Sequence, residues 1–414
     1  MPTPARTALA LLSAAAIATI GVLLVRGAAD GPTAAGPCGP ATDATYLATA
    51  LGVAERIRRE EQAGATVSRA RTTIQSDRVL ARAVARGDAA QTRREALVVL
   101  FDGEHIVRLR VFDSAGRVLA DVGGKFVLSP VYAVLRAGGR RVGRVEYSVQ
   151  DDMGYRLLTD RLDGVLTVMR YAGRTVMADI DVGARRLPTR GTVRVHGVAY
   201  LVATIVTSRF PTGRLRISAL VRRPPRTLAR QSCAQVRADV LGAVTRRVYG
   251  EDSHGPEVLV GRVAIRRSHR LAAALAAGRR GPAWVAAADA MAAGHLVRLA
   301  VRAHGRVLAD VGDTQPLIAP TAVAVRDGAH RIVGHALFAV QSARGFVGVS
   351  SYLTDSDVLV REGSRQLAGR FGGPSSVPRS GPVRYDGDTY DVASFRATKW
   401  PSGPITVYTL ARDG

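Results

Sequence analysis

The stretch that decides the fold of this chain occurs twice. The first copy is His105–Leu109 (HIVRL) followed by Gly116–Gly123 (GRVLADVG), and the second is His295–Leu299 (HLVRL) followed by Gly305–Gly312 (GRVLADVG). Within each copy apolar and charged residues alternate, which is typical of a half-buried strand, and a turn leads to a second strand. Each copy therefore predicts an antiparallel β-hairpin.

The duplication extends well beyond the hairpin at an offset near 190 residues. Val149-Gln150 matches Val340-Gln341, Gly154-Tyr155 matches Gly345-Phe346, and the segment FPTG at 210–213 matches WPSG at 400–403. Matches that keep their order over this length indicate a tandem repeat. We predict two homologous domains, unit one at 39–222 and unit two at 228–414. The proline-containing connector at 222–226 (RRPPR) separates them, because proline cannot continue strand pairing.

The hydrophobic period changes inside each unit. Residues 44–61 and 67–85 place apolar side chains every three or four positions, which predicts amphipathic helices, and unit two repeats the pattern. After residue 105 the period becomes two. Antiparallel strands are predicted at 107–111, 118–122, 131–135, 141–149, 165–170, 173–178, 191–195, 198–206 and 214–221, with a short helix at 152–162. The prediction is an α+β unit in which leading helices precede an antiparallel sheet.

The amino terminus carries a membrane signal. Nineteen residues without a charge lie between Arg6 and Arg26, enough for a helix that spans a bilayer. A cleaved signal peptide is the alternative, since small residues at 27–29 offer a cleavage site. Lipidation at Cys38 is a weaker third reading because Pro37 precedes it. We expect an uncleaved transmembrane anchor within residues 1–30, with the N-terminus inside and the bulk of the chain extracytoplasmic. Cleavage would make the protein secreted.

The chain has two cysteines, Cys38 and Cys233. In an exported protein a pair of cysteines predicts one disulfide, and two unrelated free thiols are the alternative. The two positions are not equivalent in the repeat. The predicted bond would tie the entry of unit one to the start of unit two.

The net charge of +24 comes from 58 basic and 34 acidic residues, and all but two of the basic residues are arginine. Asparagine is absent, so we attribute part of the basicity to compositional bias. The arginines are spread over the whole chain and aromatic residues make up only 5%, whereas nucleic-acid-binding surfaces cluster both. We therefore exclude nucleic acid as a partner. An anionic cell envelope, meaning wall polymers or lipid headgroups, remains a partner for this surface.

The order of elements resembles the Cache family of extracytoplasmic, PAS-like sensor domains. The resemblance rests on two leading helices, the D-x-x-G-x-V-L hairpin at 113–119, the glycine-containing strand at 142–145 and the exported location. Unit two departs from it, since the sequence at 303–305 (AHG) lacks the aspartate. The resemblance implies two tandem PAS-like units that bind a small molecule of the amino or organic acid class. No output module follows unit two in this sequence, so we expect action through a membrane signalling partner.

No sequence motif of catalysis is present. G-x-S-x-G, H-E-x-x-H, a P-loop and C-x-x-C are all missing, and His105 and His295 merely occupy matching positions at expected strand starts. Asp151 and Ser342 stand where a short helix begins, which favours a capping role. We predict no enzyme activity, no catalytic residue, no metal site and no cofactor.

Ligand-contacting residues are expected among polar or aromatic side chains on otherwise apolar strands, because a PAS-like sheet offers its concave face to ligands. An arginine there could hold a carboxylate through two parallel hydrogen bonds. For each residue the alternative is an ordinary core or surface position. If neither unit has a pocket, an envelope structural or interaction protein is the competing function. The candidates are Arg108, Tyr147, Gln150, Tyr155, Arg170 and Tyr200 in unit one, and Arg298, Gln341, Phe346, Arg361 and Tyr390 in unit two.

Overall fold

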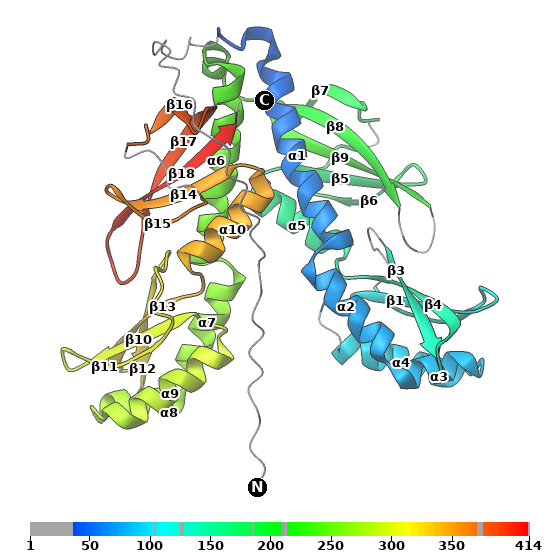
Figure 1. Ribbon diagram of the computed structural model, residues 1–414, viewed down its shortest axis with the longest axis horizontal. Coiled ribbons are helices and arrows are strands. Elements are labelled where there is room, and N and C mark those ends of the chain that lie inside the picture. Colours follow the sequence, from blue (N-terminus) through cyan, green and yellow to red (C-terminus); the bar gives the residue numbers. More distant parts are fainter. Residues whose placement is uncertain are drawn as a thin grey trace, which may run out of the picture. The chain divides into compact units, whose positions relative to one another are not determined.

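The computed structural model describes residues 36–412, except 103–104, 125–127, 129, 184–185, 209, 211–212 and 371–375 (Figure 1). The expected anchor or signal peptide at 1–30 lies outside the described residues. Within the described ranges, no helix combines the length and the apolar character needed to cross a membrane.

Unit one begins with helices and continues with strands. A 3-10 turn η1 (Gly39–Ala41) leads into the first helix. The elements that follow are α1 (Thr42–Ala63), α2 (Ala65–Ser76), α3 (Arg78–Ala85), α4 (Ala89–Asp102), β1 (Arg108–Asp113), β2 (Val118–Gly123), β3 (Val131–Ala137), β4 (Arg140–Ser148), α5 (Asp152–Asp163), β5 (Leu166–Tyr171), β6 (Arg174–Ala178), β7 (Arg190–Val195), β8 (Val198–Ser208) and β9 (Arg214–Arg222).

Unit two repeats this order element by element after the 3-10 turn η2 (Arg226–Arg230). The prediction of an α+β fold in two tandem units is therefore confirmed. Its elements are α6 (Cys233–His254), α7 (Pro256–Arg267), α8 (His269–Ala276), α9 (Arg280–Ala293), β10 (Arg298–Ala303), β11 (Arg306–Gly312), β12 (Thr321–Arg326), β13 (Ile332–Ala339), α10 (Ala343–Thr354), β14 (Asp357–Glu362), β15 (Arg365–Ala368), β16 (Ser380–Tyr385), β17 (Asp388–Thr398) and β18 (Pro404–Arg412).

Each unit contains two antiparallel sheets rather than the single sheet expected. In unit one the strand orders are β2-β1-β4-β3 and β6-β5-β9-β8-β7, and in unit two they are β11-β10-β13-β12 and β15-β14-β18-β17-β16. Strand β4 pairs with β1 on one edge and β3 on the other, and α5 then carries the chain against the long helices α1 and α6. Strand β5 therefore starts away from the free edges of β2 and β3, and it pairs with β6 and β9 in a second sheet.

The leading helices also differ from the expectation. The helix predicted over 67–85 is two helices, α2 and α3, because the carboxylate of Asp77 accepts hydrogen bonds from the backbone N–H groups of Val79 and Leu80, both at 2.9 Å. These bonds cap a new helix start. Helix α4 was not predicted. Four helices therefore precede the strands in each unit.

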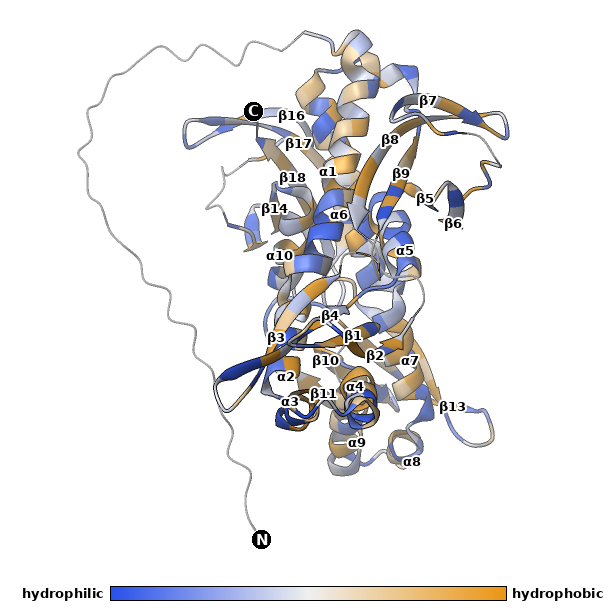
Figure 2. Cartoon of the chain, turned by 90° about the vertical axis from the view of Figure 1, so that its right-hand side faces the viewer, coloured by the Kyte–Doolittle hydropathy of each residue, from blue (hydrophilic) through white to orange (hydrophobic). Residues whose placement is uncertain are grey.

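The helices α2, α3 and α4 cover one face of the four-stranded sheet (Figures 1 and 2). Alternate strand residues such as Leu109 and Val145 point into this core, where they meet Ile74 and Leu80. The same packing joins α7, α8 and α9 to the sheet of β10–β13. The opposite face of each four-stranded sheet carries the other half of the strand residues, and it is this face that adjoins the five-stranded sheet.

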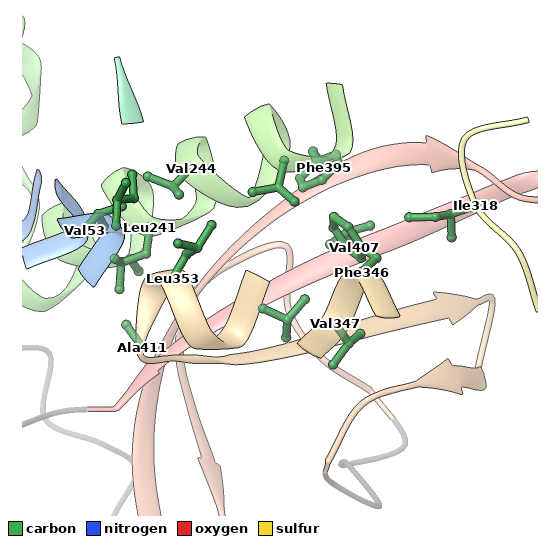
Figure 3. Close-up of a cluster of buried hydrophobic side chains, with 14 of the residues drawn as sticks. Val53, Leu241, Val244, Ile318, Phe346, Val347, Leu353, Phe395, Val407 and Ala411 are labelled. Atoms are coloured by element: carbon green, nitrogen blue, oxygen red, sulfur yellow. The ribbon is translucent and has the colours of Figure 1, made fainter. Parts of the chain in front are cut away.

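The two units share a core along their first long helices, which lie side by side in Figure 1. Val53 and Ile57 of α1 belong to one buried cluster with Leu241 and Val244 of α6 and with side chains of α10, β14 and β18 (Figure 3). Burying a side chain of this size contributes ~1.5–3 kcal/mol. The units are thus held together by a hydrophobic interface of several such residues.

Each unit also extends its short helix onto the long helix of the other. In one direction Arg161 of α5 forms an ion pair with Glu251 of α6. The Nη1 atom of Arg247 on α6 donates a hydrogen bond of 2.9 Å to the carbonyl oxygen of Asp160, in the last turn of α5. A cation at this place satisfies a free carbonyl and complements the negative end of the helix dipole.

The reverse contact uses the equivalent positions. Arg56 of α1, the repeat counterpart of Arg247, forms an ion pair with Asp355 at the C-terminal cap of α10. Burial raises the pKa of Tyr352 on α10, and its hydrogen bond with Glu60 of α1 adds to the effect. Glu60 is the repeat counterpart of Glu251. The interface between the units is therefore isologous, as in a two-fold symmetric dimer.

Cys38 and Cys233 form a disulfide at the starts of the two long helices, with their Cα atoms 4.6 Å apart. The backbone N–H of Cys38 also donates to the carbonyl oxygen of Gln231, at 2.7 Å. The hydroxyl of Thr45 lies beside both sulfur atoms. This bond closes a sequence separation of 195 residues and fixes unit one to unit two at one end of their shared interface.

Candidate functional site

A cleft of about 620 Å³ lies between the two sheets of unit two. One wall is the outward face of the four-stranded sheet, and the other is the β14–β15 hairpin together with the turn between β17 and β18. We call it the unit-two cleft. Charged, aromatic and aliphatic side chains line it, among them Arg298, Ala300, Arg302, Asp310, Leu337, Glu362, Arg365, Leu367, Lys399 and Trp400.

Strand alternation explains which side chains reach the cleft. Leu299 and Val301 point into the helical core, so Arg298, Ala300 and Arg302 of β10 face the other way. Position 337 on β13 lies directly opposite Ala300 in the strand register and contributes the Leu337 side chain to the same wall.

Arg298 is held by its own chain. Its guanidinium makes two parallel hydrogen bonds of 2.8 Å to the carboxylate of Asp310 on β11, and a third of 3.3 Å to the carbonyl oxygen of Asp313. The hydrogen bonds to Asp310 raise the pKa of Arg298. The Trp400 ring lies over the guanidinium, 5.2 Å from its carbon to the ring centroid. This arrangement ties the four-stranded sheet to the β17–β18 turn.

Unit one repeats this arrangement. Arg108 makes hydrogen bonds of 3.0 and 2.9 Å to the carboxylate of Asp121 and one of 3.0 Å to the carbonyl oxygen of Gly124, and it lies 5.2 Å from the ring centroid of Phe210. Two of the four arginines offered as carboxylate clamps, Arg108 and Arg298, thus hold an internal carboxylate. Their geometry is the bidentate one expected, with a different partner.

Two other cations of the unit-two cleft have no such partner. The side chains of Arg302 and Arg365 are exposed, and neither guanidinium forms a hydrogen bond or ion pair with a residue that the structure describes. Lys399, in contrast, forms an ion pair with Glu362. The cleft therefore presents two free guanidinium groups, an aromatic ring and the apolar side chains of its floor.

Three aromatic candidates lie in the core and do not border the unit-two cleft. Tyr147 is fully buried among the helices, and its hydroxyl donates to the carbonyl oxygen of Val67 at 2.9 Å. Tyr155 and Phe346 are buried in the cluster shared by the two units. Aromatic side chains on an apolar strand or helix face pack in this way because they bury a large area.

The two glutamines cover the first turns of α5 and α10. A Cβ atom on Gly154 would collide with the Gln150 side chain, and one on Gly345 with that of Gln341, so the paired glycines make room for them. The backbone N–H of Ser342 donates to Oε1 of Gln341, at 3.1 Å.

The predicted caps are confirmed beside these glutamines. Asp151 accepts a hydrogen bond of 2.6 Å from the N–H of Gly154, and Ser342 accepts one of 3.0 Å from the N–H of Gly345. Each bond satisfies a backbone donor that the first turn of a helix leaves free.

The remaining candidates belong to the five-stranded sheets. Arg170 is bonded to the Thr175 hydroxyl and the carbonyl oxygen of Gly183, both at 3.3 Å. Arg361 is buried in β14 with 4% of its surface exposed. Tyr200 and Tyr390 pack against the small cores on the outer face of these sheets.

The strand-start positions expected for His105 and His295 are not observed. Both are exposed and stand in turns just before β1 and β10, with φ of 61° and 50°. In the described part of the chain, no three side chains of the His, Cys, Asp and Glu types gather as a metal site would require.

The residues that sequence reasoning missed are Arg302, Arg365, Lys399 and Trp400. Arg302 could have been found, because it alternates on the same strand face as Arg298. Trp400 stands in the repeated WPSG segment, whose match to FPTG marked the turn but not its position over an arginine. Arg365 carries no local signal, since only the approach of two sheets places it beside the cleft.

Comparisons with known proteins give partial likenesses only. No family model matches the chain, and neither does any curated protein. The periplasmic domain of Vibrio cholerae LuxQ matches with 8% identity, covering 42% of this chain and 100% of that chain at a TM-score of 0.30. The ligand-binding domain of the Pseudomonas fluorescens chemoreceptor CtaA, solved with L-alanine, matches with 12% identity over 45% and 100% of the two chains at 0.23.

A third solved structure is the sensory domain of the Campylobacter jejuni chemoreceptor Tlp3 with isoleucine bound. It is 11% identical and covers 45% of this chain and 97% of that chain, at a TM-score of 0.20. Each of these matches covers about as much of the chain as one unit. TM-scores at this level do not establish a common fold.

Proposed function

We propose that this chain is a membrane-anchored, extracytoplasmic pair of Cache-like sensor units that binds a small organic or amino acid. The observation that carries the proposal is the unit-two cleft. Its volume of about 620 Å³ falls in the range of small-molecule sites, which are concave and combine apolar walls with a few polar groups. In this role the protein is a binding protein and not an enzyme.

The ligand class follows from the charges in the cleft. Arg302 and Arg365 present donors that no described residue of the chain accepts from. A guanidinium matches the planar geometry of a carboxylate, and such charge-assisted hydrogen bonds are stronger than neutral ones. An acid is therefore the small molecule that this cleft suits best.

The location and partner rest on other observations. The disulfide between Cys38 and Cys233 supports an oxidising compartment, where such bonds persist. The uncharged run within residues 7–25 supplies the anchor. Action through a membrane signalling partner is part of the proposal and rests on the resemblance to sensor domains.

A thermal-shift screen of the full chain tests the binding function. A ligand that binds only the folded protein raises the melting temperature, and at a hundredfold excess over Kd it adds ~2.7 kcal/mol of stability. We expect at least one carboxylate or amino acid in a broad panel to raise the melting temperature, with sodium chloride of equal ionic strength as the control. If every compound in the panel acts no better than the salt, the proposal is wrong.

A second candidate function is contact with the anionic cell envelope, and a surface hollow beside η1 favours it. The hollow of about 540 Å³ is lined by the connector arginines Arg222, Arg223 and Arg226. Arg223 pairs with Asp43 at 2.7 Å, while the other two have no partner among the described residues. Basic groups at a membrane surface attract acidic headgroups.

Co-sedimentation with lipid vesicles tests this second function. We expect the full chain with Arg222 and Arg226 changed to serine to lose salt-sensitive attraction to phosphatidylglycerol vesicles relative to phosphatidylcholine vesicles. If the variant still co-sediments with phosphatidylglycerol vesicles as the parent does, the binding comes from the overall charge of the protein and not from the connector.

A further inference from the structure

We propose that unit two alone binds the ligand, that the ligand is a short dicarboxylate, and that unit one fills its corresponding site with its own side chains. The inference rests on the proposed function of the unit-two cleft and adds which unit binds and what it takes.

In unit one, a row of large polar side chains crosses the outward face of the four-stranded sheet. Arg110 of β1 lies opposite Glu146 of β4, and Glu146 lies opposite Tyr132 of β3. The Tyr132 hydroxyl is 3.4 Å from Oε1 of Glu146. Glu146 is 4% exposed, and its burial raises the pKa of the carboxyl. The row therefore covers the surface with polar groups, in which Tyr132 is bonded to Glu146 and Arg110 forms an ion pair with Asp121.

Unit two has small or aliphatic residues in the same row. The strand register places Ala300 of β10 opposite Leu337 of β13, and Leu337 opposite Ala322 of β12. Arginine is thus replaced by alanine, glutamate by leucine and tyrosine by alanine at equivalent positions. Ala300 and Leu337 line the unit-two cleft. At the place where unit one carries Arg110 and Glu146, the wall of the cleft is therefore formed by the smaller Ala300 and the uncharged Leu337.

The neighbouring position shows the opposite exchange. Phe112 of unit one is buried under two guanidinium groups, those of Arg110 and Arg144, whose carbons lie 5.2 and 4.5 Å from the ring centroid. Its counterpart in unit two is Arg302, since both pair with the equivalent residue of the next strand. Unit two has therefore lost the buried ring and gained a free cation at the edge of the cleft.

The second free cation stands on the other wall. Arg365 begins β15 in the five-stranded sheet, whereas Arg302 belongs to the four-stranded sheet. The other two cations of the cleft are paired with carboxylates of the chain. Two free guanidinium groups on facing walls suit a ligand with a carboxylate at each end, whose short apolar middle lies on Ala300 and Leu337.

Isothermal titration calorimetry on the full chain tests this inference with succinate and glutarate as dicarboxylates and acetate and L-alanine as monocarboxylates. We expect a dicarboxylate to bind more tightly than either monocarboxylate. Changing Arg302 or Arg365 to serine should weaken its binding about tenfold or more, because each change removes a charge-assisted contact. Both residues are exposed, so these variants retain the fold.

Arg174 supplies the matched control. It begins β6 and is the unit-one counterpart of Arg365, with the same exposure class and the same place in a hairpin. Arg174→Ser should leave the dicarboxylate affinity unchanged. A loss in this variant equal to that in Arg365→Ser would overturn the assignment to unit two.

A filled cleft gives an independent test. The double variant Ala300→Arg with Leu337→Glu transplants the unit-one pair into unit two, where the strand register is the same. We expect it to abolish dicarboxylate binding. Circular dichroism checks that the variant is folded. If it is not, the dicarboxylate affinity of Arg302→Ser decides the question.

The outcomes separate the two proposals. Binding of a monocarboxylate or amino acid without any dicarboxylate preference would overturn this inference and keep the proposed function. Dicarboxylate binding that survives in Arg302→Ser and Arg365→Ser would place the ligand elsewhere and also overturn it. If none of the four compounds binds, this inference is wrong, and the broad thermal-shift panel separately decides the proposed function.

Discussion

The sequence identifies Arg108 and Arg298 as equivalent residues of the repeat, but it does not identify the side chains that they contact. Each belongs to the motif that identifies the repeat, and each holds an aspartate of the adjacent strand and an aromatic ring from the distant β8–β9 or β17–β18 turn. The pairing strand supplies the aspartate, which lies within the same motif. The ring arrives from about 100 residues further along the chain, so only the folded molecule reveals it.

The first prediction concerns this contact. Arg108→Ala removes the bidentate bond to Asp121 and the ring contact with Phe210, and leaves a carboxylate that is one-third exposed. We expect the free energy of unfolding to fall by ~1–2 kcal/mol, with ligand binding in the unit-two cleft unchanged. Urea denaturation measures the effect, with Arg136→Ala, an exposed position near the end of β3, as control. Equal stability of the two variants would contradict a bracing role.

The second prediction concerns Asp252 on α6. Burial raises its pKa to about 7, and repulsion by Glu257 adds to the effect. Between about pH 4 and pH 7 the folded protein therefore keeps a proton that the unfolded chain has lost. The contribution of Asp252 to stability is fully present below about pH 4 and is lost as the pH rises through about 7.

Asp252→Asn removes this dependence because the amide stays neutral. We expect the variant to exceed the parent in unfolding free energy by on the order of 2 kcal/mol at pH 8, and to lose that advantage below about pH 4. Chemical denaturation at several pH values measures the difference. A constant difference across the whole range would show that Asp252 does not titrate as stated.

At the scale of elements, the observed strand bounds agree closely with the predicted ones, because a hydrophobic period of two is a strong local signal. Strand β8 was predicted at 198–206 and spans Val198–Ser208, and α5 was predicted at 152–162 and spans Asp152–Asp163. The observed bounds of the leading helices agree less well with the prediction. Their period is continuous through residues 67–85, and the break comes from one side chain, Asp77, whose capping bonds compete with a continued helix.

The third prediction tests that break. Asp77→Ala removes both hydrogen bonds to the start of α3 and should lower the free energy of unfolding by ~1 kcal/mol. Ser268 is the repeat counterpart and caps α8 through one bond of 3.3 Å, so Ser268→Ala should cost less. Thermal denaturation of the two variants side by side measures the order. The reverse order would mean that these caps do not control the helix starts.

At the scale of the whole described chain, the two units pair as the subunits of an isologous dimer do. The reciprocal contacts of α5 with α6 and of α10 with α1 use equivalent positions, and the shared cluster lies between them. Within that pair the outward faces of the four-stranded sheets differ, since unit one carries Arg110, Glu146 and Tyr132 where unit two has Ala300, Leu337 and Ala322. The pairing of the units is therefore compatible with different side chains on these faces.

The fourth prediction separates the disulfide from the hydrophobic interface. If a protease site is placed in the connector and cut, the two halves should co-elute in size-exclusion chromatography even after reduction, because α1 and α6 share a buried core. Separation of the halves on reduction would show that the covalent bond, not the interface, holds them.

The fifth prediction concerns the bond itself. Changing Cys38 and Cys233 together to serine should lower the stability of the intact chain by ~2–5 kcal/mol, through the freedom that the unfolded chain regains. Thermal denaturation against the parent protein measures the loss. A variant as stable as the parent would mean that the connector and the interface already supply the whole constraint.

The sequence by itself determined the repeat, the α+β class, most strand positions and the pairing of two cysteines, because these depend on local period, on spacing and on composition. It did not determine that each unit has two sheets, that its clamp arginines hold internal aspartates, or that a cleft opens in unit two. Those features depend on which surfaces meet in the folded chain. Packing between distant segments places β4 and β5 in different sheets, and it places Arg302 and Arg365 in the walls of one cleft. The tertiary structure alone decided them.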